Sequence, residues 1–163
     1  MIDLERALHE LHRGGVEFII VGGVAATIHG ATRVTQDLDI VYARTPENID
    51  RLATALAPHR PYLRGAPPGL PFRWDAETIR RGLNFTLTTA LGDLDLLGEI
   101  VGGGGYADLL PHCQSVTLSG VEYRCLGLER LIHVKRAAGR PRDLEAIAEL
   151  EALREQGGDP DAG

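Results

Sequence analysis

Apolar residues recur at helical or strand spacing along most of the chain, and glycines or prolines separate the runs. Leu4, Leu8 and Leu11 lie three or four residues apart, which predicts an amphipathic helix that Gly14 ends. The run from Val16 to Val21 is continuous, apolar and rich in β-branched residues, as expected of a buried strand. The pattern therefore predicts an N-terminal helix followed by a core strand.

The remaining patterns predict helices, strands and two irregular segments. The predicted helices span 24–29, start at Thr45-Pro46, form one or two turns within 75–81, and cover 128–138 and 142–154. The predicted strands are a single strand over 35–42 and two hairpins that pair 84–89 with 94–101 and 116–118 with 121–126. Prolines and glycines predict an irregular surface loop over 58–71 and a flexible break over 102–105.

This order of elements predicts an α+β fold, in which a small mixed β-sheet is flanked by helices and followed by C-terminal helices. We expect a single domain over residues 1–155 and a frayed tail over residues 156–163. No internal repeat is present in the sequence.

The composition is that of an ordinary globular protein, with 44% hydrophobic and 25% charged residues among 163. The formal net charge of -6 argues against binding to bulk DNA, because neutralising phosphates requires an excess of Lys and Arg. A structured RNA stays open as a partner, since a local basic patch is compatible with this charge. The P-loop pattern GxxxxGKS or GxxxxGKT and the hydrolase pattern GxSxG do not occur.

The cysteines and the N-terminus indicate the compartment. Cys113 and Cys125 form no CxxC pair, and the N-terminus lacks the basic-then-apolar pattern of a secretory signal. The longest apolar stretches are too short to cross a bilayer. We therefore expect a cytoplasmic protein with reduced thiols and no membrane partner.

The first candidate for chemistry is the pair Asp37 and Asp39 in the predicted strand over 35–42. Residues two apart on a strand point to the same face, with Cα atoms roughly 6.5–7 Å apart. Such carboxylates raise each other's pKa unless a cation compensates them, and oxygen ligands favour Mg²⁺ or Mn²⁺. The alternative for an isolated pair is an exposed strand end with two solvated aspartates.

The second candidate is Gly22-Gly23, which lies between the predicted core strand and the following helix. Glycines there let a phosphate approach the backbone, and the start of a helix offers free N–H groups. Alone, a diglycine at a strand end is only a turn. Followed by a strand that carries Asp37 and Asp39, it predicts a phosphate site facing a metal site.

These motifs resemble a known superfamily when they are taken together. Residues 19–23 (IIVGG), 33–39 (RVTQDLD) and 92–97 (GDLDLL) are similar to the polymerase-β-type nucleotidyltransferases, with their diglycine turn, their DxD strand and a third carboxylate on a neighbouring strand. The chain more closely resembles the minimal bacterial members related to the toxins of abortive-infection and type IV toxin–antitoxin systems. The resemblance extends over residues 16–150 and implies a nucleotidyltransferase fold.

The third carboxylate is either Asp93 or Asp95, which share one face if both belong to the strand. Asp93 follows a glycine in the predicted turn, where an aspartate is ordinary. Asp95 lies among leucines, where a carboxylate is unfavourable unless a cation compensates it. Asp95 also falls where the superfamily has its third acid, so we prefer Asp95. The predicted catalytic and metal-binding residues are Asp37, Asp39 and Asp95.

The resemblance also implies a set of nucleotide-binding residues, namely Gly22, Gly23, Arg33, Thr35 and Lys135. Lys135 opens a late basic segment that ends at Asp143 and is similar to one in the abortive-infection-type enzymes. For Lys135 and Asp143 the alternative is a solvated basic helix end. The chain departs from the superfamily at Val24, where a serine usually donates its hydroxyl to the triphosphate.

The resemblance implies transfer of a nucleoside monophosphate from an NTP, with Mg²⁺ or Mn²⁺ as cofactor. The acceptor would be a hydroxyl of a protein, of an RNA such as a tRNA, or of a small molecule. A cognate antitoxin is a further expected partner if the protein belongs to a toxin–antitoxin pair. The alternative hypothesis is a catalytically weak or inactive binding module of the same fold, which acts as an antitoxin or a regulatory partner.

Overall fold

The computed structural model describes residues 1–32 and 35–157 of the chain. Its strands are β1 (Phe18–Val21), β2 (Asp37–Tyr42), β3 (Tyr62–Leu63), β4 (Phe85–Thr89), β5 (Gly92–Leu97), β6 (Glu99–Ile100), β7 (Gly104–Gly105), β8 (Cys113–Leu118) and β9 (Val121–Leu126). Its α-helices are α1 (Leu4–Arg13), α2 (Gly22–Ile28), α3 (Pro46–Leu56), α4 (Ala76–Arg81), α5 (Tyr106–Leu109), α6 (Leu128–Ala138) and α7 (Leu144–Gly157). Short 3₁₀ turns cover Ala57–His59, Leu110–His112 and Pro141–Asp143.

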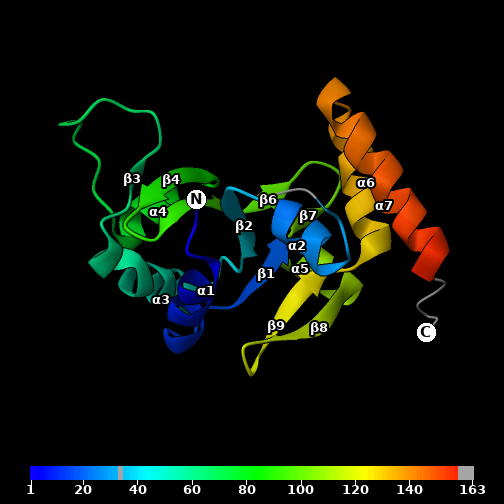
Figure 1. Cartoon of the computed structure of the whole chain (residues 1–163). Helices are drawn as coiled ribbons and strands as arrows, with labels where there is room; N and C mark the ends of the chain where they lie inside the picture. Colours follow the sequence, from blue (N-terminus) through cyan, green and yellow to red (C-terminus); the bar gives the residue numbers. More distant parts are fainter. Residues whose placement is uncertain (33–34, 158–163) are drawn as a thin grey trace.

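A seven-stranded mixed sheet forms the centre of the molecule, in the order β3-β4-β5-β2-β1-β9-β8 (Figure 1). The central strand β2 pairs antiparallel with β1 and parallel with β5. The β2–β5 register places Asp37 opposite Asp93 and Asp39 opposite Asp95. Carboxylates that lie far apart in the sequence thus become neighbours across two strands.

The helices pack in two groups. α1 packs on α3 and α3 on α4, whereas α2 packs on α6 and α6 on α7. The α6–α7 pair lies at one end of the molecule, on the right of Figure 1. Thr45 caps α3 by accepting a hydrogen bond from Asn48 N at 3.2 Å, as the Thr-Pro pair predicts.

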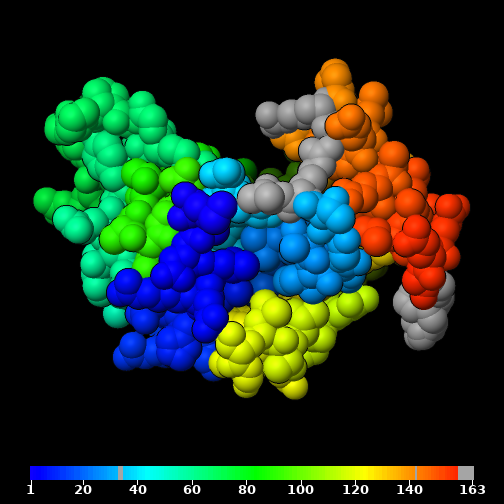
Figure 2. Space-filling view, viewed as in Figure 1, coloured from blue at the N-terminus to red at the C-terminus, as the bar shows by residue number. Residues whose placement is uncertain are grey.

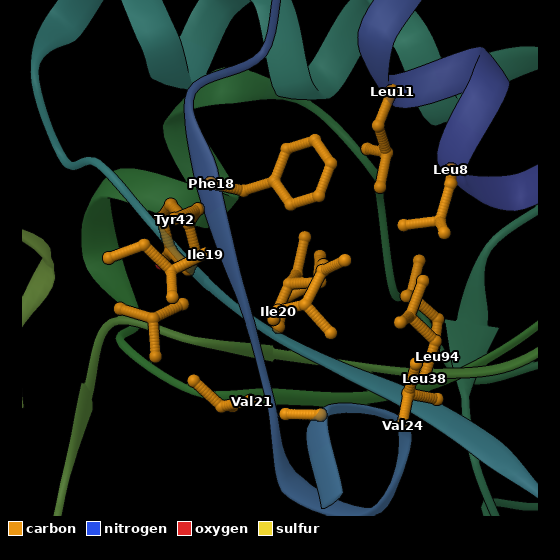
Figure 3. Close-up of a cluster of buried hydrophobic side chains, with 14 of the residues drawn as sticks. Leu8, Leu11, Phe18, Ile19, Ile20, Val21, Val24, Leu38, Tyr42 and Leu94 are labelled. Atoms are coloured by element: carbon orange, nitrogen blue, oxygen red, sulfur yellow. The ribbon is translucent and has the colours of Figure 1, made fainter. Parts of the chain in front are cut away.

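The hydrophobic core orients the strands that carry the aspartates (Figure 3). Leu38 of β2 is fully buried and Leu94 of β5 is 1% exposed. Leu8 and Leu11 of α1 belong to the same cluster. Because successive side chains of a strand point to opposite faces, burying Leu38 and Leu94 turns the aspartates beside them to the other face of the sheet.

The predicted α+β class is confirmed, and so are both hairpins, β4 with β5 and β8 with β9. Two predictions of irregular structure were wrong in part. Residues 102–105 contain β7, which pairs with β6, and residues 58–71 contain β3, which extends the main sheet beside β4. The last helix, α7, continues to Gly157. The single-domain boundary at residue 155 stays a prediction, and residues 158–163 lie outside the described residues.

The glycine-rich segment forms regular structure because its glycines make close contacts. A side chain at Gly102 would overlap Ala137 of α6, and one at Gly104 would overlap the Asp108 carboxylate. Both glycines have positive φ, 77° and 78°, a conformation that other residues rarely adopt. Composition alone suggested a break, whereas the glycines here permit packing against α6. None of the helices within residues 1–32 and 35–157 combines the length and apolarity that a membrane span requires.

Candidate active site

Three carboxylates meet where β2 and β5 lie side by side. Asp37 and Asp39 of β2 and Asp95 of β5 each present an oxygen, and these oxygens all lie within 4.8 Å of one another. The parallel register brings them together, because Asp95 lies directly opposite Asp39. A set of three carboxylates without nitrogen or sulfur ligands fits a hard divalent cation such as Mg²⁺ or Mn²⁺.

Asp93 shares this face of β5 but is not one of the three converging acids. The side chain of Asp93 is 42% exposed, whereas that of Asp95 is 22% exposed. The geometry therefore favours Asp95 over Asp93 as the third ligand, and Asp95 is the residue that we propose.

The Asp39 carboxylate is in an unfavourable environment. Its Oδ1 atom is buried and has no hydrogen-bond partner among the described residues. Burial, followed by the charges of Asp37 and Asp95, raises the pKa of Asp39 to about 8, and the charge of Lys135 acts in the opposite direction. Burial and the charge of Asp95 also raise the pKa of Asp37. A bound cation would satisfy the unpartnered oxygen and stabilise the ionised forms.

The diglycine turn lies against these acids. Gly22 has a positive φ of 67°, and a methyl group added there would overlap Asp39 Oδ2 and lie 2.9 Å from Asp39 Cγ. A methyl group at Gly23 would lie 3.1 Å from Thr35 Oγ1. The absence of side chains at the turn therefore lets Asp39 and Thr35 approach the start of α2 closely.

A basic cluster lies near Asp39. Lys135 Nζ donates a hydrogen bond to Asp143 Oδ1 at 3.4 Å, and Arg140 Nε donates one to Asp143 Oδ2 at 2.7 Å. Asp143 itself is 3% exposed. Although burial acts to raise it, hydrogen bonds from Arg140 and the charge of Lys135 hold the pKa of Asp143 below its ordinary value. Asp143 thus fixes both cations beside the site.

Two cavities share Lys135 and Arg140 in their linings. One, of about 280 Å³, also contacts Gly23 and Ala26 of α2. The other, of about 430 Å³, contacts Gly22 and Asp39. Its apolar wall consists of Leu97, Ile100, Val101, Leu131 and Val134. Cavities of about 480 and 620 Å³ lie elsewhere, along β8, β9 and α1, and none of the predicted site residues lines them. Figure 2 shows a broad hollow between the green β3–β4 side of the molecule and the orange C-terminal helices.

Arg64 is a site residue that sequence analysis did not identify. It directly follows β3, and its Nη2 atom donates hydrogen bonds to Asp95 Oδ1 at 2.8 Å and to Leu87 O at 2.7 Å. Its Nε atom lies 3.4 Å from Asp93 Oδ2, and its Nη1 atom lies 3.9 Å from Asp37 Oδ2. A single arginine in a Pro-rich segment carries no sequence signal for such contacts.

The other sequence-predicted residues are placed as follows. Gly22 lies against Asp39, and Thr35 lies beside Gly23. Lys135 lines both cavities, Gly23 lines the first and Gly22 lines the second. Arg33 lies outside the described residues. Arg140, which sequence analysis named only as part of the basic segment, lines both cavities.

The fold can be compared with known proteins. No protein-family model matches the chain, and no curated protein sequence matches it. Solved structures do match. The lincosamide antibiotic adenylyltransferase LnuA, in a lincomycin-bound crystal structure, aligns with a TM-score of 0.62 and 14% identity over 92% of this chain and 95% of that chain.

Two further structures have the same fold. The antibiotic-resistance factor ANT(2'')-Ia in solution aligns with a TM-score of 0.59 and 16% identity over 95% of this chain and 82% of that chain. A candidate nucleotidyltransferase from Thermotoga maritima aligns with a TM-score of 0.52 and 15% identity over 96% and 94% of the two chains. The protein therefore has the nucleotidyltransferase fold, as the sequence motifs imply.

Proposed function

We propose that the protein is a metal-dependent nucleotidyltransferase, which moves a nucleoside monophosphate from an NTP to an acceptor hydroxyl. The observation that carries the proposal is the convergence of Asp37, Asp39 and Asp95 beside the diglycine turn, with one Asp39 oxygen buried and unpartnered. A buried carboxylate without a donor is unfavourable unless a cation or a proton compensates it. The shared fold with adenylyltransferases supports the same reaction.

The three aspartates would hold Mg²⁺ or Mn²⁺. When bound, such a cation supplies charge stabilisation for the phosphates and lowers the pKa of a nearby acceptor hydroxyl. Arg64 holds Oδ1 of Asp95, so Oδ2 is the oxygen that remains for a ligand or for the hydroxyl proton of the acceptor. Attack of the hydroxyl oxygen on the α-phosphorus forms the new P–O bond, and the bond to the bridging oxygen of the β-phosphate breaks, releasing pyrophosphate.

The triphosphate would lie against α2 and the basic cluster. The first N–H groups of a helix have no partner within the helix and can donate to phosphate oxygens. Val24 is 3% exposed and offers no hydroxyl where the superfamily has a serine. Thr35 Oγ1 lies beside Gly23, so Thr35 can supply a hydroxyl to the same surface. Lys135 and Arg140 would balance the phosphate charge from the two cavities.

We propose a small hydroxyl-bearing molecule as the acceptor. LnuA is lincomycin-bound in its structure, and a crystal structure of ANT(2")-Ia contains adenylyl-2"-tobramycin. The fold thus serves small-molecule acceptors in two neighbours that resemble this chain along most of its length. A protein acceptor, an RNA acceptor such as a tRNA, and a role beside a cognate antitoxin are the competing outcomes of the experiment.

The experiment incubates the protein with each α-³²P-labelled NTP, Mg²⁺ or Mn²⁺, and one of three acceptor pools: small hydroxyl compounds including lincosamides and aminoglycosides, total RNA, or total protein. We expect label on a small molecule. Asp37→Asn and Asp95→Asn are expected to lower the rate at least about 100-fold without unfolding the domain, whereas Asp50→Asn, a 66% exposed aspartate on α3, serves as the matched control. Full activity in both site variants would contradict the site assignment.

The binding-module hypothesis makes a different prediction for the same samples. An inactive module of this fold would transfer no label to any pool and would bind neither Mn²⁺ nor an NTP. Calorimetric titration with Mn²⁺, alone and with each NTP, therefore separates the two. Mn²⁺ binding that Asp39→Asn removes supports the metal site even if the acceptor has not yet been found among the three pools.

A further inference from the structure

The side chain of Arg64 is held in the carboxylate cluster by the backbone of a neighbouring strand. Arg64 N donates to Thr86 O at 3.0 Å, and Arg64 Nη2 donates to Leu87 O at 2.7 Å. Both acceptors belong to β4, which pairs with β5 next to Asp95. The side chain of Arg64 is 28% exposed. The main-chain bond places Arg64 beside β4, and the bond to Leu87 O gives the guanidinium a fixed partner besides the acids, so Arg64 is a built part of the site rather than a mobile counter-ion.

The charges around Arg64 are distributed unevenly. Arg64 contacts Asp37, Asp93 and Asp95. Asp39 Oδ1, in contrast, has no partner among the described residues. Arg64 therefore pairs directly with Asp37, Asp93 and Asp95, whereas Asp39, on which the charge of Lys135 acts, keeps an oxygen without a hydrogen-bond partner.

We propose that Arg64 is a positioning residue for nucleotidyl transfer: it fixes the carboxylate of Asp95 and supplies a permanent positive charge to Asp37, Asp93 and Asp95, which leaves the unpartnered Asp39 oxygen for a divalent cation. The role of Arg64 in positioning Asp95 for transfer rests on the proposed function. The role of its charge depends only on cation binding by the cluster.

Two effects of opposite sign follow when Arg64 is replaced by a neutral residue. The cluster becomes more negative, so a divalent cation binds more tightly. Asp95 loses the donor that holds Oδ1, so its carboxylate can rotate and the alignment needed for transfer is lost. An arginine that only stabilised the fold would not give tighter cation binding, because its loss would weaken cation binding and transfer together.

The experiment measures Mn²⁺ binding from the EPR signal of free Mn²⁺, and kcat and KM for transfer, in wild type, Arg64→Gln and Arg64→Lys. Arg64→Gln is expected to bind Mn²⁺ about 3–10-fold more tightly and to lower kcat about 10–100-fold. Arg64→Lys keeps the charge but not the paired donors, so its Mn²⁺ affinity should stay within about twofold of wild type while kcat still falls. Arg81→Gln, which removes the same charge from a 79% exposed side chain on α4, is the control.

The outcomes that overturn the proposal are equally definite. Mn²⁺ binding by Arg64→Gln that is unchanged or weaker contradicts the role of the charge, and an unchanged kcat contradicts the positioning role. If Arg64→Gln does not fold, as circular dichroism would show, Arg64→Lys decides the positioning role through kcat and the charge role through Mn²⁺ affinity. If wild type transfers no label, the proposed function fails, while the Mn²⁺ comparison still tests Arg64.

Discussion

At the scale of single residues, the close approach of Gly22 to Asp39 links the diglycine turn to the metal site. The turn is usually interpreted as a phosphate site, because glycine exposes backbone N–H groups. Here Gly22 has a second role, since any side chain would displace the Asp39 carboxylate. The positive φ of 67° adds a conformational reason for glycine at this position.

A substitution at Gly22 should therefore impair cation binding as well as stability. We expect Gly22→Ala to lower the free energy of unfolding by about 1–3 kcal/mol and to weaken Mn²⁺ binding at least about tenfold, measured by urea unfolding and by calorimetry. Gly120→Ala is the matched control, because Gly120 also has positive φ (80°) but no atom within 4 Å of an added methyl group. Equal Mn²⁺ affinity in the two variants would show that Gly22 acts only through its backbone conformation.

At the scale of residues, the sequence predicts only those contacts that follow from the spacing of residues along the chain. Asp37 and Asp39 could be paired because strand periodicity places them on one face. Asp95 could be preferred because it lies among leucines. Arg64 could not be found, since its approach depends on β3 pairing with β4, and neither its neighbours nor its spacing predicts that pairing.

At the scale of elements, the position of β2 depends on a buried asparagine at the start of α3. Asn48 is fully buried, and its Oδ1 accepts a hydrogen bond from Glu17 N at 2.6 Å. Its Nδ2 donates to Glu17 O at 3.0 Å and to Ala43 O at 2.7 Å. These bonds join α3 to the residues that directly precede β1 and follow β2, and thereby fix the strand that carries Asp37 and Asp39.

Removing the Asn48 side chain should destabilise the protein more than removing the cap of the same helix. We expect Asn48→Ala to lower the free energy of unfolding by about 2–4 kcal/mol, because three backbone groups lose their bond to a fully buried side chain and one of these bonds, to Ala43 O, is itself buried. Thr45→Ala removes only the cap and should lower it by about 1 kcal/mol. Urea unfolding of both variants measures the difference. Equal losses of unfolding free energy would mean that water forms the hydrogen bonds that the Asn48 side chain makes in the wild type.

The elements that sequence analysis predicted well are those with a clear period. The helix over 128–138 and the strand over 121–126 have the predicted bounds, because each shows one amphipathic period between turn residues. The two-residue strands β3 and β7 were missed, since two residues show no period, and β6 was predicted only as the end of a single strand over 94–101. Their pairing follows from the tertiary contacts of Gly102 and Gly104 and from the position of β4.

At the scale of the whole molecule, the crowded acids link stability to pH. Burial and neighbouring carboxylates raise the pKa of Asp39 to about 8, and the pKa of Asp37 is also raised. The folded protein therefore keeps protons that the unfolded chain has released near its ordinary pKa of 3.8. Since the folded state binds more protons between these values, its stability falls as pH rises towards 8 in the absence of a metal.

The pH dependence can be assigned to Asp39 by one substitution. In buffer with a chelator, we expect the wild-type free energy of unfolding to fall between pH 5 and pH 8, and Asp39→Asn to be more stable than wild type at pH 8 by about 2 kcal/mol. The pKa values of Asp143, Asp75 and Glu77 are lowered. The contribution of these three groups to the free energy of unfolding therefore changes mainly below pH 5, outside the measured range. Urea unfolding at several pH values measures the profiles, with the exposed Asp50→Asn as control. Parallel profiles for wild type and Asp39→Asn would mean that Asp39 is already ionised and compensated in the metal-free protein, which would remove the physical reason for placing a cation beside it.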